Sequence, residues 1–295
     1  MSDDALFAAS WLALREPVDA RSRAERLNGM AAAWLAERRA ATRRPLKVLD
    51  LGAGSGSNLR YLGSRLAMPQ HWTLIDQDAA LLDIAMAEAA PCEAEARCVD
   101  MGRWRRRPDE LAAWLDGTDL LTASALLDLM SHPWVTMLAE AASRHRVAVL
   151  LALSVNGDWR LDTQSPASRE WTREDQWVRH VYRDHQATDK GVGQALGGQA
   201  PAVMASALEA CGYRLYLADS PWVLQGLDDR ALGEALLDGW RSAACEQAPE
   251  AADAIRDWHA ARLSCWRRGE LTIRVGHRDL LALPGSTMPT GTARR

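Results

Sequence analysis

Apolar and polar residues alternate in blocks along most of the chain, and the blocks predict strands followed by helices. From Leu46 onward, five apolar runs read as buried strands: LKVLDLG, HWTLIDQD, AEARCVDMG, TDLLTAS and RVAVLLALSV. Between them lie stretches with apolar residues three and four positions apart, as in helices. Apolar strands separated by helices predict a parallel sheet covered on both faces. We therefore expect an α/β fold: a doubly wound, mostly parallel, seven-stranded sheet with helices on both faces.

The segments that do not follow this alternation of strands and helices divide the chain further. Two helical patterns precede the first strand, DDALFAASWLALRE and a second that begins after Pro17, so residues 1–44 are expected to form an N-terminal helical cap. Residues 45–155 and 200–285 are expected to form a Rossmann-like core, in which RLYLADSPWVL reads as one strand. The polar stretch 156–199 is expected to be an insertion that acts as a lid at an acceptor site. Residues 227–268 read as helices inserted within the core, and residues 286–295 as a tail.

Composition excludes several classes of protein. With 39 acidic and 35 basic residues, the chain has no global field that attracts nucleic acid or anionic membranes. The one dense basic run, GRWRRRP, is interpreted as a solvated loop. Five cysteines without ligand spacing predict no metal site. The N-terminal apolar run is too short for a signal peptide or a membrane span, so we expect a cytoplasmic protein.

Three glycines follow the first predicted strand, in DLGAGSG. Gly52, Gly54 and Gly56 lie between a strand and a helix, where glycine lets a ligand approach the backbone and the helix start offers free N–H groups. A dinucleotide site is written GxGxxG, but Ser57 stands at the third glycine position. Asp50, at the strand end, would repel a pyrophosphate and attract a cationic ligand. S-adenosylmethionine, which carries an ammonium and a sulfonium, is such a ligand.

These features resemble a class I S-adenosylmethionine-dependent methyltransferase of the Rossmann-like, small-molecule type, over roughly residues 46–224. The resemblance implies a transfer of a methyl group to oxygen or nitrogen of a small molecule, with S-adenosylhomocysteine as the product. A first alternative is an NAD(P)-dependent Rossmann oxidoreductase, which shares the glycine turn. A second alternative is a protein that binds S-adenosylmethionine without catalysis.

The resemblance also implies which residues bind the cofactor. Asp76, followed by Gln77, occupies the position that chelates the ribose hydroxyls, although Asp78 next to it is a plausible helix N-cap. Asp100 would accept from the adenine amino group and Met101 would offer its backbone N–H. One arginine of the cap, Arg21 or Arg23, would pair with the cofactor carboxylate. The implied cofactor-binding residues are Asp50, Gly52, Ala53, Gly54, Gly56, Asp76, Gln77, Asp100, Met101, Ser124 and Arg23.

Acceptor-binding groups are expected beyond the carboxyl ends of the strands. Asp128 and Asn156 follow the fourth and fifth strands, and Lys190 lies in the insertion. His185 is the candidate catalytic base, since histidine titrates near neutral pH, although an exposed or structural histidine is the open alternative. The helices in 227–268 offer either a wall for the acceptor site or the interface of a homodimer, and core packing explains their tryptophans equally well.

Overall fold

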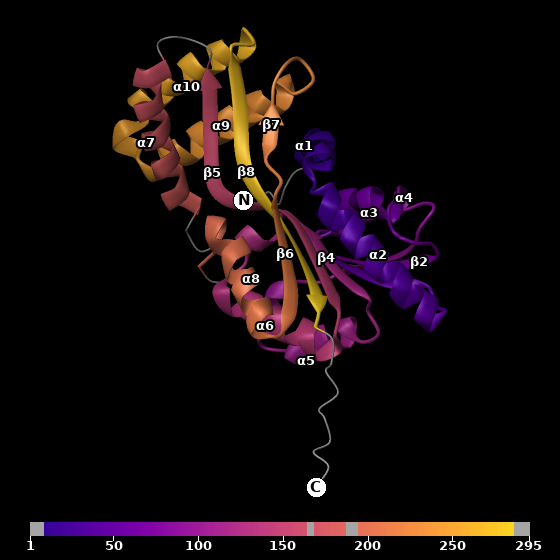
Figure 1. The fold of residues 1–295 in the computed structure, drawn as a ribbon. Coiled ribbons are helices and arrows are strands. Elements are labelled where there is room, and N and C mark those ends of the chain that lie inside the picture. Colours follow the sequence, from indigo (N-terminus) through magenta and orange to yellow (C-terminus); the bar gives the residue numbers. More distant parts are fainter. Residues whose placement is uncertain (1–8, 164–167, 187–193, 286–295) are drawn as a thin grey trace.

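The computed structural model describes residues 9–163, 168–186 and 194–285, and in them an eight-stranded sheet forms the centre of the fold (Figure 1). The strands are β1 (Leu46–Leu51), β2 (Gln70–Asp76), β3 (Glu93–Cys98), β4 (Leu120–Ser124), β5 (Ala148–Thr163), β6 (Tyr213–Asp219), β7 (Trp222–Leu224) and β8 (Leu271–Pro284). Their order is β3-β2-β1-β4-β5-β8-β6, and β7 also pairs with β8. Strands β1 to β5 are mutually parallel, whereas β8 runs antiparallel to β5, β6 and β7. The doubly wound α/β prediction is confirmed, with eight strands where seven were expected.

Helices cover both faces of the sheet. The helices are α1 (Ala9–Ser22), α2 (Glu25–Thr42), α3 (Ser57–Gly63), α4 (Ala79–Ala87), α5 (Pro108–Leu115), α6 (His132–His145), α7 (Ser168–Gln186), α8 (Ala200–Ala210), α9 (Arg230–Gln247) and α10 (Ala252–Arg267). One hydrophobic core joins the sheet to α2, α3 and α4, and a second joins it to α5, α6 and α8. No described helix has both the length and the apolar character needed to cross a membrane.

A third hydrophobic core lies beyond the main sheet. The far halves of β5 and β8, together with β7, carry one side of it, and α7, α9 and α10 cover that side (Figure 1). Its centre is aromatic: Trp159 of β5 stacks on Trp240 of α9 with ring centroids 4.2 Å apart. Trp258 and Trp266 of α10 are also buried there. Core packing therefore accounts for these tryptophans.

Three element boundaries differ from the sequence prediction. Pro17 does not end the first helix, because α1 continues through it to Ser22 and the break comes at Arg23 and Ala24. The fifth strand does not stop at Val155 but continues to Thr163, with register shifts along its pairing with β8. Residues 156–163 therefore belong to the sheet. The predicted strand RLYLADSPWVL is two strands, β6 and β7, separated at Ser220 and Pro221.

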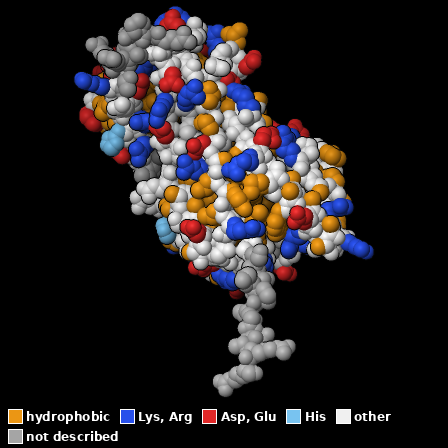
Figure 2. All heavy atoms as spheres, in the orientation of Figure 1, with side chains coloured by type: hydrophobic (Ala, Val, Ile, Leu, Met, Phe, Trp, Pro, Cys, Tyr) orange, Lys and Arg blue, Asp and Glu red, His pale blue; other side chains and the backbone are white. Residues whose placement is uncertain are grey.

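The outer surface carries charged side chains over most of the visible face, and apolar side chains gather near β6 and β8 (Figure 2). Leu217 of β6, an edge strand, is 41% exposed. The run GRWRRRP is partly neutralised, because Glu110 of α5 accepts from Arg103 at 2.8 Å and from Arg107 at 3.1 Å.

Candidate functional site

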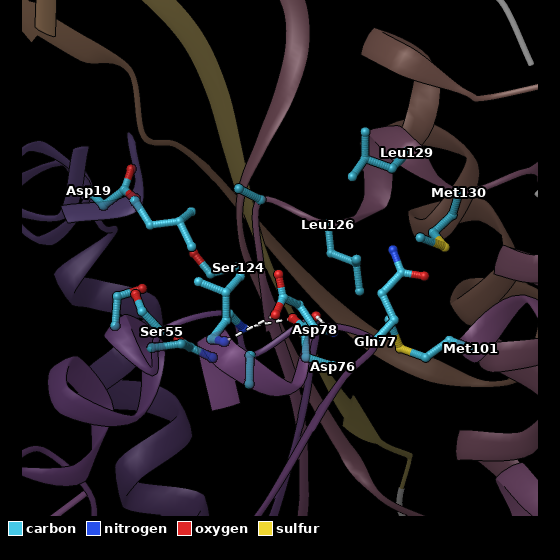
Figure 3. A pocket seen from close by; sticks show the side chains of 18 of the residues that line it. Asp19, Ser55, Asp76, Gln77, Asp78, Met101, Ser124, Leu126, Leu129 and Met130 are labelled. Carbon is cyan, nitrogen blue, oxygen red and sulfur yellow. Dashed lines mark hydrogen bonds between the residues drawn. The ribbon is translucent and has the colours of Figure 1, made fainter. Parts of the chain in front are cut away.

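A cavity of about 460 Å³ opens at the carboxyl ends of β1, β2 and β4, beneath α1 (Figure 3). The strand ends meet here because the strands are parallel, and this edge is where doubly wound folds bind ligands. The residues that line it are Leu12, Arg15, Asp19, Gly52, Ala53, Gly54, Ser55, Ser57, Asn58, Asp76, Gln77, Asp78, Leu81, Asp100, Met101, Gly102, Ser124, Ala125, Leu126, Leu129 and Met130.

The glycine turn forms the floor of the cavity. Gly52 and Gly56 have φ angles of 62° and 86°, which strain any residue with a Cβ. A Cβ on Gly52 would also lie 2.8 Å from Leu126 Cδ1, and one on Gly56 would lie 2.9 Å from Ala85 Cβ. The backbone therefore requires glycine at both positions. Gly56 itself does not line the cavity; it is the N-cap residue of α3.

Asp76 joins the glycine turn to the end of β2. Its Oδ2 accepts from the Gly54 amide at 2.8 Å, and its Oδ1 accepts from the Asp78 amide at 3.0 Å. Asp78 caps α4 by accepting from the amides of Ala80 and Leu81. Asp78 is therefore the cap, and Asp76 is left at the cavity wall beside Gln77 with lone pairs that a ligand hydroxyl can use.

The third and fourth strands flank β2 and β1 in the sheet, and residues at or after their ends also line the cavity. Asp100 follows β3 and caps the short helix η1 (Met101–Arg105), since its Oδ1 accepts from the Gly102 amide at 2.8 Å. Asp100 is exposed, Met101 is buried, and both line the cavity. Ser124, the last residue of β4, also lines the cavity. The structure thus brings Asp76, Gln77, Asp100, Met101 and Ser124 together around one cavity.

Asp50 lies behind the cavity wall and is fully buried. Its Oδ1 accepts from Asn58 Nδ2 at 2.7 Å, and its Oδ2 has no hydrogen-bond partner in the described part of the chain. Burial raises the pKa of the Asp50 carboxyl to about 7. Asp50 does not line the cavity, whereas Asn58, which donates to it, does.

Arg23 lies at the junction of α1 and α2 and is 6% exposed. Its Nη1 donates to Asn58 Oδ1 at 3.0 Å, whereas its Nε and Nη2 are buried without hydrogen-bond partners among the described residues. Burial lowers the pKa of the Arg23 guanidinium. Arg23 lines a second cavity of about 260 Å³, which shares Asp19, Ser57 and Ser124 with the first. Arg21, the other candidate, instead donates to Asp229 at 2.6 Å.

Asp19 is a site residue that the sequence analysis missed. It is 8% exposed and stands where the two cavities meet. It accepts from Arg15 Nε at 2.8 Å and from Trp222 Nε1 at 3.0 Å, and burial raises the pKa of its carboxyl. The four-residue spacing of Arg15, Asp19 and Arg23 was the available signal, since residues four apart share one helix face.

Of the residues predicted to bind or activate an acceptor, Asp128, Asn156 and His185 are not among the residues that line either cavity. Asp128 is near Tyr182 of α7, whose pKa rises to about 12 mainly through burial and also through the Asp128 charge. Asn156 accepts from the Asp158 amide at 3.0 Å and lies against Gly276. His185 contacts Glu246 of α9, with Nε2 and Oε2 3.2 Å apart, so the structure does not bring this predicted base to the cavity. Lys190 lies outside the described residues.

Comparisons with known proteins find similar solved structures but no match in sequence. No protein-family model matches the chain, and no curated protein matches its sequence. Among solved structures, the cyclopropane synthase MmaA2 of Mycobacterium tuberculosis is 12% identical, with a TM-score of 0.42 over 81% of this chain and 78% of that one. A putative methyltransferase of Bacillus halodurans is 12% identical, with a TM-score of 0.44 over 82% and 94%.

A third solved structure is phosphoethanolamine N-methyltransferase 2 of Haemonchus contortus. It is 12% identical, with a TM-score of 0.42 over 96% of this chain and 60% of that one. At such identities and TM-scores, these similarities assign no substrate and no residue role to this chain.

Proposed function

We propose that this protein is an S-adenosylmethionine-dependent methyltransferase that acts on a small molecule. The observation that carries the proposal is the charge of the cavity wall. Four carboxylates line it, those of Asp19, Asp76, Asp78 and Asp100, and Arg15 is the one cationic side chain in the described wall. Such a wall favours a cationic ligand and opposes a pyrophosphate, so it disfavours NAD(P).

The second cavity supports a ligand with an amino-acid end. Arg23 offers two buried donors without partners, and a guanidinium suits a carboxylate. Asp19, on the same side of the helix, offers a carboxylate to an ammonium at the point where the cavities meet. An α-amino acid group carries both charges, and S-adenosylmethionine ends in one.

The ribose and the adenine of the cofactor would bind in the first cavity. Asp76 would accept from the ribose hydroxyls, and Gln77, Asp100 and Met101 would surround the adenine. The cofactor, when bound, supplies an activated methyl group on its sulfonium. The protein would orient the acceptor toward that methyl and exclude water, which accounts for much of the acceleration of an in-line displacement.

Calorimetry with S-adenosylmethionine, S-adenosylhomocysteine and NAD tests the cofactor assignment. We expect micromolar binding of the first two and none of NAD. Asp76→Asn should weaken S-adenosylhomocysteine by about tenfold, because it removes a charged hydrogen-bond acceptor. Asp83→Asn is the matched control, since Asp83 is exposed on α4. Binding of NAD instead would overturn the proposal, and a bound cofactor whose labelled methyl is never released to any acceptor would favour a non-catalytic binding protein.

A further inference from the structure

Two side chains hold the Arg23 guanidinium, and their contacts limit how it can meet a ligand. Asn58 Oδ1 accepts from Arg23 Nη1 at 3.0 Å, and the guanidinium carbon lies 4.6 Å from the centre of the Tyr61 ring. The ring thus covers one face of the planar group, and Asn58 occupies one of its terminal nitrogens. The Nε and Nη2 atoms remain without hydrogen-bond partners among the described residues. Their N–H groups are the side-on pair of donors that a carboxylate accepts in two parallel hydrogen bonds.

The orientation of the Asn58 amide is set by a backbone carbonyl of β5. Thr122 Oγ1 donates its single proton to Leu150 O at 2.8 Å, so this oxygen can only accept from Asn58. Asn58 Nδ2 therefore points to Thr122 Oγ1, at 3.1 Å, and also donates to Asp50 Oδ1, at 2.7 Å. Both amide protons are then in use, and the Oδ1 that remains is the acceptor for Arg23. The Leu150 carbonyl thus determines, through two side chains, that Asn58 presents an acceptor to the guanidinium.

Resting on the proposed function above, we propose that Asn58 is a positioning residue for the cofactor, which directs the Nε and Nη2 donors of Arg23 to the carboxylate of S-adenosylmethionine. Asn58 is 3% exposed and lines the first cavity, whereas Arg23 lines the second. A guanidinium with a free Nη1 offers a carboxylate its terminal pair of nitrogens as well as its side-on pair. Occupation of Nη1 by Asn58 leaves one orientation, which fixes the end of the chain that carries the sulfonium.

Two ligands test this role: S-adenosylhomocysteine and methylthioadenosine, which share the nucleoside and the thioether and differ in the amino-acid end. Calorimetry measures both dissociation constants for the wild type and for Asn58→Leu, which keeps the branched shape of the side chain but removes its acceptor. We expect Asn58→Leu to weaken S-adenosylhomocysteine by about tenfold and methylthioadenosine by less than about twofold. Equal weakening of the two ligands would show a general packing role and overturn the proposal.

A double-mutant cycle with Arg23→Met separates positioning from direct contact. Because Asn58 acts through Arg23, Asn58→Leu should cause no further loss of S-adenosylhomocysteine affinity in the Arg23→Met background. Additive losses would mean that Asn58 touches the ligand or supports the fold independently of Arg23, and they contradict the proposal.

Thr122→Val gives a test that does not depend on the folding of Asn58→Leu. It keeps the side-chain volume and removes the oxygen that orients the amide, so S-adenosylhomocysteine should weaken by about threefold and methylthioadenosine should be unaffected. Thr118→Val is the control, because Thr118 is 6% exposed, donates to Trp114 O at 2.9 Å and lines neither cavity. Equal affinity of these two variants for S-adenosylhomocysteine overturns the role of the amide. Absence of S-adenosylhomocysteine binding to the wild type would instead overturn the proposed function itself, and the role of Asn58 with it.

Discussion

The Oδ2 of Asp279, on β8, accepts a hydrogen bond from the Ala24 amide at 2.8 Å, where α1 ends and α2 begins. Its Oδ1 accepts from the Leu153 amide at 2.8 Å and from Ser220 Oγ at 2.6 Å. Leu153 lies in the irregular part of β5, with a φ of 52°, and Ser220 separates β6 from β7. One fully buried carboxylate thus holds together the α1–α2 junction, the irregular part of β5 and the β6–β7 junction. The first of these contacts positions Arg23, next to Ala24, beside the cavity.

Asp279→Ala should therefore destabilise the protein strongly. It leaves two amides and a hydroxyl without an acceptor, at about 1–3 kcal/mol each, so we expect a loss of about 3 kcal/mol or more in the free energy of unfolding. Urea unfolding measures it. Asp219→Ala is the control, because Asp219 is exposed and its pair with Arg278 should contribute less than about 1 kcal/mol. Equal losses in the two variants would contradict the role of Asp279.

Two glycines of α9 should respond in opposite directions to alanine. A Cβ at Gly233 would clash with the Trp266 ring, which is buried and donates to Arg230 O. Gly233→Ala should cost roughly 1–3 kcal/mol of stability through overpacking. A Cβ at the exposed Gly239 meets nothing within 4 Å, so Gly239→Ala should stabilise the helix by up to about 1 kcal/mol. Thermal melting of both variants measures the two changes in stability. A Gly233→Ala variant as stable as the wild type would contradict the close packing of Gly233 against Trp266.

Asp50 should make the stability of the ligand-free protein depend on pH. Its folded pKa of about 7 lies above the ordinary value of 3.8, so between these pH values the folded state holds a proton that the unfolded state has lost. The free energy of unfolding should fall as pH rises through that window. The shift of about three units corresponds to roughly 4 kcal/mol at most.

Asp50→Asn removes this dependence, so the stability of the wild type relative to the variant should decline from pH 4 to pH 8. The comparison isolates Asp50, because the other titrating groups are common to both proteins. A difference that stays constant over this range would show that Asp50 is not protonated in the folded state near neutral pH.

Arg23 and Arg21 should differ in their effect on ligand binding. Arg23→Met keeps the aliphatic stem but removes the buried donors, and should weaken S-adenosylhomocysteine by about tenfold or more. It should leave methylthioadenosine unaffected, since this ligand has the same nucleoside and no amino-acid end. Arg21→Met is the control, because Arg21 pairs with Asp229. Equal weakening of both ligands by Arg23→Met would assign Arg23 to the fold alone.

The sequence predicted the layered core because local periodicity determines it. The strands β1 to β5 and their helices were recognisable from apolar runs and helical spacing. The positions where the pattern failed are set by partners distant in the chain: Asp279 places the break after Arg23, and β8 with Trp159 extends β5 beyond Val155. Local sequence patterns do not predict contacts between residues so far apart in the chain.

The candidate site was predictable where a residue's position along a strand decides its place. Asp76, Asp100 and Ser124 stand at strand ends, and parallel strands bring their ends together. Leu12, Arg15 and Asp19 were missed because they reach the cavity through the docking of α1, which depends on Trp222 and on Arg60 with Glu16. The burial of Asp50 behind Asn58 is likewise a tertiary property.

Strands β5 and β8 each pass through the main sheet and the aromatic core beyond it. The hydrogen-bonded pair of β5 and β8 thus contributes to both cores, and the two strands continue from one core into the other without an intervening linker. Removing α7, α9 and α10 would expose the far halves of β5 and β8, whose near halves belong to the sheet that carries the cavity. We therefore expect these helices to unfold together with the main sheet in one transition.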